Sequence, residues 1–409
     1  MSEYVVHPYG DLLITNHPPV GSFAVWDEPE DLSDVSDTGP TSDHGECAEP
    51  DMSTPEAFDS DRLSALDASS SIEPAPGVLL RVSSSHLIMA SDRAKRMLMG
   101  PWKETNAVYP DDLRHWDIEG CLDSTALTVV MDIIHGRTRR VPRSLELDML
   151  AKVAVVVDDL QCHEAVEIFS DMWIGELDYL PSQYTRDLVL WIFIASVFQR
   201  QKLLDSAIRT AILQCTDEFR TLNLPIPTRI VDAIDTERQE LLHQAIMALD
   251  TLFERLCDDD AGCSFACRNA LLGALVRQMR SKQLLWPRPS KPFPGLSFAS
   301  LAADVRCFQS PVFYIPVERD PYAHDEPPEG EEPNYFAYGP TKKKGKGRKT
   351  YCAECSSVVN VSPGVSVALD GCRLQDLLED ELCRLEANVK VWTLASLEHM
   401  PISTPPTTN

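Results

Sequence analysis

The chain has 409 residues, of which 44% are hydrophobic, and a formal net charge of -26. This length allows two or three domains with buried cores. The most apolar run, residues 188–198, is too short to cross a bilayer. The amino terminus lacks the basic start and apolar segment of a secretory signal, so we expect reduced cysteines and a cytoplasmic or nuclear location.

Two short strands are predicted near the amino terminus, at residues 11–15 and 23–26, joined by a Pro-rich turn. The segment that follows, residues 27–76, holds fifteen Asp and Glu residues and one basic residue, Arg62. It is too polar to bury a core, so we predict a disordered acidic insert. It is either a docking segment open to phosphorylation or a solvated loop, and the solvated loop is the simpler interpretation.

An apolar strand at residues 78–82 is predicted to pair with these amino-terminal strands across the insert. Ser83 or Ser84 then begins one helix that ends at Gly100, with apolar residues at helical spacing. A second strand is predicted at residues 115–118. Three more helices are predicted from their apolar residues, at 122–134, 147–160 and 165–173.

The runs VSSSHLIMASDRAKRMLMGPWKE and DIIHGRTRRVPRSLELDMLAKVAVVVDDLQCHEAVEIFSDMWI resemble a BTB/POZ domain, in particular that of fungal BTB-domain proteins with a helical carboxyl-terminal extension. The likeness continues through YTRDLVLWIFIASVFQ and TLNLPIPTRIVDAID. It covers roughly residues 10–315 and departs from the family at the acidic insert and at 105–121. The resemblance implies an α+β fold in which helices cap a small sheet.

The same resemblance implies a non-catalytic protein-protein interaction module that pairs with itself or with other proteins. One role that it allows is that of an adaptor for a cullin-type ubiquitin ligase. BTB relatives commonly pair through the first helix and the amino-terminal strands. A homodimer surface is therefore expected at residues 87–99 and 12–14, with Met89 and Met97 as adaptable contacts.

The predicted domains are the BTB/POZ domain at 1–180, a helical companion domain at 181–315, a disordered linker at 316–351 and a carboxyl-terminal segment at 352–409 with one helix. Helices of the companion are predicted at 185–198, 203–214, 270–279 and 298–308, with a long one beginning at Pro225 to Pro227. Trp173 and Trp191 lie within apolar runs, so both are predicted to be core residues.

The linker contains a basic run, Lys342 to Lys349. The run could be a nuclear localisation signal or a contact to a phosphate backbone. A solvated linker is the simpler interpretation, because no aromatic residues are interleaved to stack bases. The alternative function is therefore a zinc-stabilised nuclear regulator that contacts nucleic acid through this run.

Cysteines are the only candidates for site chemistry. Cys263 and Cys267 lie about one helical turn apart, and Cys352 and Cys355 have the spacing of a zinc knuckle. Together they could form a four-thiolate zinc site. The simpler interpretation, which we adopt, is that they bind no metal. Cys257 and Cys372 are reserve candidates for ligands of this zinc site.

No enzyme signature is present, neither a Gly-x-Ser-x-Gly elbow nor a His-Glu-x-x-His pair nor a dinucleotide-type glycine loop. The resemblance gives structural or surface positions to His86, His135 and His163. The acidic clusters at 158–159 and 258–260 are expected to be solvated caps at helix ends. We therefore expect no catalytic residue, no cofactor, no small-molecule substrate and no membrane contact.

Overall fold

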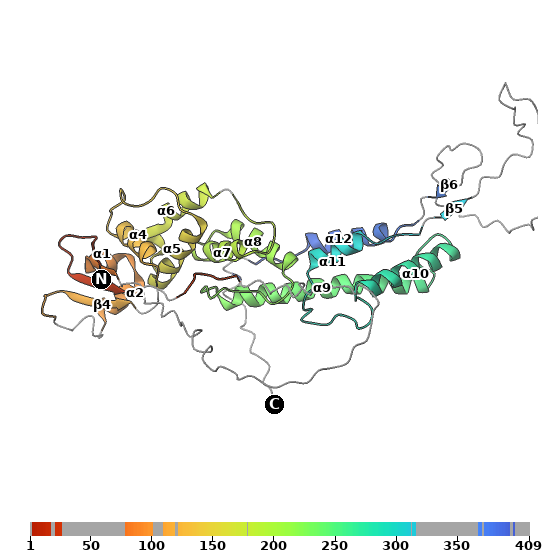
Figure 1. Cartoon of the computed structure of the whole chain (residues 1–409), viewed down its shortest axis with the longest axis horizontal. Helices are drawn as coiled ribbons and strands as arrows, with labels where there is room; N and C mark the ends of the chain where they lie inside the picture. Colours follow the sequence, from red (N-terminus) through yellow and green to blue (C-terminus); the bar gives the residue numbers. More distant parts are fainter. Residues whose placement is uncertain are drawn as a thin grey trace, which may run out of the picture. The chain divides into compact units, whose positions relative to one another are not determined.

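The computed structural model describes residues 2–17, 21–26, 78–100, 109–118, 122–177, 179–311, 313–315, 367–369, 372–392 and 396. The chain divides into two compact units, which are treated separately below (Figure 1). Unit 1 comprises residues up to 179 together with 222–225, and unit 2 comprises 180–221 and the residues from 226 onward. Their independent folding stays a prediction. The described residues form a mixed α+β fold.

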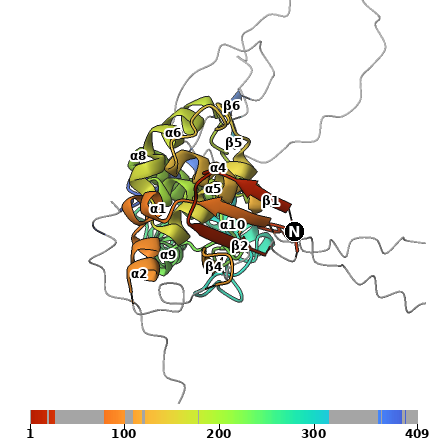
Figure 2. The same ribbon diagram turned by 90° about the vertical axis from the view of Figure 1, so that its left-hand side faces the viewer.

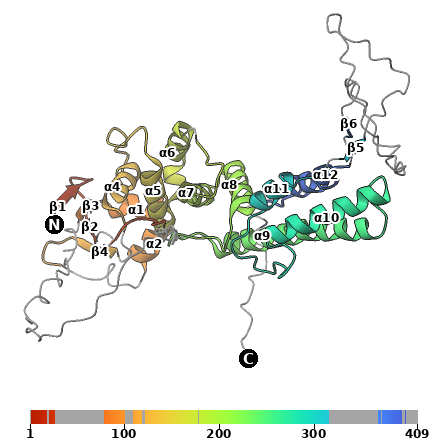
Figure 3. The same cartoon turned by 45° about the vertical axis from the view of Figure 1, so that its right-hand side comes forward.

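Unit 1 contains a four-stranded sheet with helices beside it (Figures 2 and 3). Its order is β1 (Ser2–Val5), β3 (Val78–Val82), β2 (Leu12–Asn16) and β4 (Arg114–Ile118). β2 pairs antiparallel with β3 and parallel with β4, and β1 pairs parallel with β3. Alternate residues of β2 are buried, as expected for a strand with one face on a core. The predicted pairing of 78–82 with the first strand is confirmed.

The strand predicted at residues 23–26 is wrong. Residues 23 and 24 form a turn, and Ala24 has a φ of 48°, which is incompatible with an extended strand. Phe23 lies under Lys152 of the helix α5 (Leu147–Leu160), with the ammonium 5.6 Å from the ring centroid. The edge of the sheet beside β3 is instead occupied by β1, which the sequence prediction missed.

The single helix predicted after Ser83 is two helices, α1 (Ser84–Ala90) and α2 (Asp92–Met99). Ser91 interrupts them with an extended backbone. Its hydroxyl accepts a hydrogen bond from the Ala94 amide and donates one to the Leu160 carbonyl. Because Ser91 caps α2 and is anchored to the end of α5, the chain turns where periodicity alone predicts continuity.

The remaining helices of unit 1 agree with the prediction. They are α4 (Ser124–Ile134), α5 and α6 (His163–Glu176). Asp123 caps α4 by accepting from the Thr125 and Ala126 amides. Packing of α4 against both α5 and α6 places one layer of helices beside the sheet, so unit 1 is a small sheet covered by helices.

Helices make up most of the described part of unit 2. Its elements are α7 (Arg186–Val197), α8 (Gln201–Gln214), α9 (Thr228–Cys257), α10 (Phe265–Ser281), α11 (Phe298–Arg306), β5 (Phe313–Ile315), β6 (Val367–Leu369) and α12 (Leu374–Ala387). Long helix α9 packs against α8, α10, α11 and α12, and α7 packs against α8 (Figure 3). The helices of residues 181–315 agree with the prediction, whereas the antiparallel pair of β5 with β6 was not predicted.

Several predictions concern segments outside the described residues: the acidic insert at 27–76, the linker at 316–351 and the basic run within it. They stay predictions. Within the described ranges, no helix combines the length and the hydropathy that a membrane crossing requires.

Candidate metal centre

Three cysteine side chains of unit 2 converge, although they are distant in sequence. The sulfur atoms of Cys263, Cys267 and Cys372 all lie within 4.8 Å of one another. Cys267 is buried, and the other two are half-buried. In the part of the chain that the structure describes, no other group of three or more His, Cys, Asp or Glu residues has metal-ligand proximity.

Cys263 lies in the loop between α9 and α10. Just after the end of α9, the Asp260 amide donates a hydrogen bond to the Arg255 carbonyl. Gly262 has a φ of 85°, and a Cβ there would lie 2.8 Å from Cγ of Arg268. A side chain at position 262 would therefore be strained and crowded. Glycine at this position lets the loop turn back over α10 and brings Cys263 beside it.

Cys267 lies in the first turn of α10. Its amide donates to the hydroxyl of the N-cap residue Ser264, with the two atoms 3.2 Å apart. The sulfur of Cys263, four residues earlier in the loop, lies within 4.8 Å of the Cys267 sulfur, so the structure brings together the two cysteines that the sequence pairs.

Cys372 comes from the other end of the unit, two residues before α12. The start of this helix is fixed by the Leu374 amide, which donates to the Ser310 hydroxyl over 2.9 Å. Further along α12, Glu379 accepts from Arg306 of α11. Because α10 and α12 both pack on α9, the Cys372 sulfur lies close to those of Cys263 and Cys267.

The sequence predicts Cys263 and Cys267 as candidate ligands, and Cys372 only as a reserve ligand. Cys372 follows Cys267 by about a hundred residues, so no short spacing motif connects them. Cys257, the other reserve, is exposed and does not belong to the group. Cys352 and Cys355 lie outside the described residues, so the predicted four-thiolate site stays untested.

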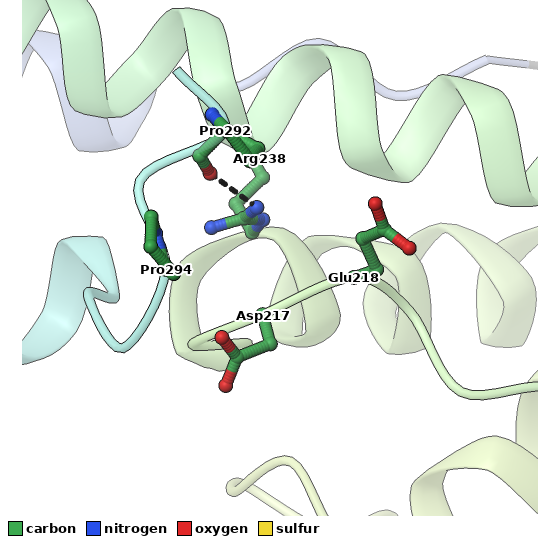
Figure 4. Close-up of a pocket in the computed structure, with 5 residues that line it drawn as sticks. All are labelled: Asp217, Glu218, Arg238, Pro292 and Pro294. Atoms are coloured by element: carbon green, nitrogen blue, oxygen red, sulfur yellow. Dashed lines mark hydrogen bonds between the residues drawn. The ribbon is translucent and has the colours of Figure 1, made fainter. Parts of the chain in front are cut away.

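A second candidate, the pocket around Arg238 in unit 2, has a cavity of about 290 Å³ (Figure 4). Arg238 donates to the Pro292 carbonyl over 2.8 Å, and to three more backbone carbonyls at 3.4 to 3.5 Å. The carboxylates of Asp217 and Glu218 line the same cavity. The guanidinium donates to backbone carbonyls, and the acidic groups would repel an anionic ligand. We therefore interpret Arg238 as a structural residue that holds the surrounding loops together.

Three histidines cluster in unit 1. The ring centroid of His86 lies 5.0 Å from that of His135 and 5.9 Å from that of His7. His135 is buried, its Nδ1 lies 2.8 Å from the Met131 carbonyl, and its Nε2 accepts from the Ser83 amide at 2.9 Å. These contacts require a neutral ring with the proton on Nδ1. His163 begins α6 and is half-buried.

We expect the stability of the protein to fall on acidification because of His135. Burial lowers its pKa below the usual value, and the neighbouring His86 and His7 lower it further. Below about pH 6.5 the unfolded chain takes up a proton that the folded state resists, whereas above it the contribution is fully present. Thermal melts on both sides of this pH should show a weaker pH dependence in His135→Gln than in the wild type.

Equal pH dependence in His135→Gln and the wild type would show that protonation of His135 is not coupled to folding.

The acidic clusters lie at helix ends, as predicted, but two of their carboxylates are ion-paired instead of merely solvated. Asp159 pairs with Arg93 of α2, and Asp259 lies 2.6 Å from Nε of Arg268. Burial raises the pKa of Asp159, whereas the Arg93 charge opposes that shift. Both contacts join neighbouring segments, which is a structural role.

Comparison with known proteins adds no assignment to this geometry. No protein-family model, no curated protein and no solved structure matches the chain.

Proposed function

We propose that unit 1 is a protein-protein interaction module of the BTB/POZ type, without catalytic activity, that pairs with itself or with other proteins. The observation that supports the proposal is the order of elements around the sheet. Antiparallel strands β2 and β3 are followed by α1 and α2, by β4 parallel to β2, and by α4 to α6. This is a small sheet covered by helices, the fold that the sequence resemblance implies.

The surface that suits pairing lies on α1 and α2. Met89 and Met99 are 86% and 64% exposed. Exposed methionines provide apolar and adaptable contacts. Leu12 and Ile14, which the resemblance placed in a dimer surface, are fully buried on β2. They are core residues, because they face the helices that cover the sheet. Met97, the other contact expected from the resemblance, is only half-buried, whereas Met99 is exposed, so the proposed surface consists of Met89 and Met99.

Light scattering on the full chain tests homotypic pairing at micromolar concentration. We expect a dimer for the wild type and a monomer for the double variant Met89→Glu, Met99→Glu, because two buried carboxylates would oppose association. Ile168→Glu is the matched control, since Ile168 is an 81% exposed apolar residue of α6 in the same unit. This control should remain dimeric.

A monomeric wild type would exclude homotypic pairing and leave heterotypic pairing. In that case a purified cullin-type scaffold is tested against the wild type and the double variant. Binding that survives both glutamates would remove the α1 and α2 surface from the proposal. Absence of both self-association and scaffold binding would contradict the adaptor role.

A further inference from the structure

We propose that Cys263, Cys267 and Cys372 bind one Zn²⁺ ion through three thiolates, with a fourth ligand from outside this group. The site belongs to unit 2 and goes beyond the interaction function proposed for unit 1. Thiolates are the softest protein ligands and select zinc among the common divalent cations. The convergence of three of them from separate segments is the observation that carries the proposal.

The distances suit this ion with a small adjustment. Zinc binds cysteine sulfur at about 2.3 Å, which places two sulfurs of a tetrahedral site about 3.8 Å apart. The three sulfurs already lie within 4.8 Å of one another. Rotation of side chains about Cα–Cβ would therefore close the site without rearrangement of the helices.

Burial separates this interpretation from ordinary core packing. Cys267 is buried and would be explained as a small apolar residue. Cys263 and Cys372 are only half-buried, so core packing does not account for their position. The half-buried side of the group also gives a solvated ion a path of entry, which a site closed on all sides would lack.

Zinc at this place would fasten three segments together. The loop after α9, the first turn of α10 and the start of α12 each contribute one sulfur. Binding converts three thiols into thiolates and releases their protons to the buffer, so affinity falls as the pH falls. The expected role is structural, because the free energy of binding at three cysteines that the fold already holds together adds to the stability of the folded unit.

The test uses the full chain, purified under reducing conditions, stripped with a chelator and titrated with Zn²⁺ against a chromophoric competitor. We expect one ion per chain. Cys263→Ser and Cys372→Ser should each weaken binding at least about 100-fold, the upper end of the effect of losing an outer-shell partner. Cys257→Ser is the matched control, since it removes an exposed thiol at the end of α9, and it should bind like the wild type.

Co²⁺ is the second probe, because sulfur-to-cobalt charge-transfer absorption reports thiolate ligation and should weaken in the same two variants. Melting curves of the metal-free proteins show whether a variant has lost its fold. Half-buried positions 263 and 372 should melt like the metal-free wild type, which leaves binding as the quantity that changes.

Two results would overturn the proposal. The reduced chain could bind no zinc. Alternatively, zinc binding could survive in both variants and be lost only in the double variant Cys352→Ser, Cys355→Ser, which would place the ion elsewhere.

Discussion

Trp173→Ala should lower the free energy of unfolding of unit 1 by roughly 3–5 kcal/mol, the usual cost of truncating a buried tryptophan. The side chain is 0% exposed. Its Nε1 donates to the Pro142 carbonyl over 2.9 Å, and its ring centroid lies 5.8 Å from that of Phe169. The loss is a large share of the 5–15 kcal/mol that stabilises a typical domain. Chemical denaturation followed by a spectroscopic signal that reports on unit 1 measures this loss of stability.

Ile168→Ala is the matched control, because Ile168 lies on the same helix, is 81% exposed, and its truncation removes little buried surface. Its effect should stay within about 0.5 kcal/mol, as for most surface substitutions. Trp173→Phe should be intermediate, since it keeps an aromatic ring and loses the hydrogen bond to Pro142. A Trp173→Ala protein as stable as the wild type would show that the side chain is not part of the core.

Most helices could be predicted because their signal is local. Apolar residues at helical spacing predict α4 to α9, and capping residues such as Asp123 agree with the observed ends. Strands depend on partners that the sequence does not reveal. Residues 23–26 look like a strand by composition, yet β1 takes the position beside β3. The break at Ser91 likewise depends on its tertiary hydrogen bond to Leu160.

The candidate site was predictable to the same extent. Cys263 and Cys267 are four residues apart, so their proximity is a local feature that the sequence predicts. Cys372 joins them only because α12 packs on α9, a contact between distant segments. The burial of Arg238 could have been predicted, because this residue interrupts the apolar stripe of α9 between Ile234 and Leu241. A charged residue on such a stripe indicates a buried partner.

Arg238→Met should lower the free energy of unfolding of unit 2 by roughly 3 kcal/mol, because hydrogen bonds to a charged group are worth about 1.5–3 kcal/mol each when strong and less when long. Arg238 is 1% exposed and its short bond is to Pro292. Its longer bonds reach Thr216 in one loop and Leu296 in another. The variant would leave these carbonyls without their donor, and urea denaturation of unit 2 measures the result.

The same substitution on an exposed arginine of the same helix, Arg255→Met, is the control and should change the stability little. Arg238→Lys tests geometry apart from charge: an ammonium is a compact donor group and lacks the planar fork that reaches carbonyls from two loops. It should therefore be less stable than the wild type and more stable than Arg238→Met. An Arg238→Met protein at least as stable as the wild type would mean that water satisfies these carbonyls within the cavity. The cost of burying the guanidinium would then outweigh its hydrogen bonds, as happens with some buried ion pairs.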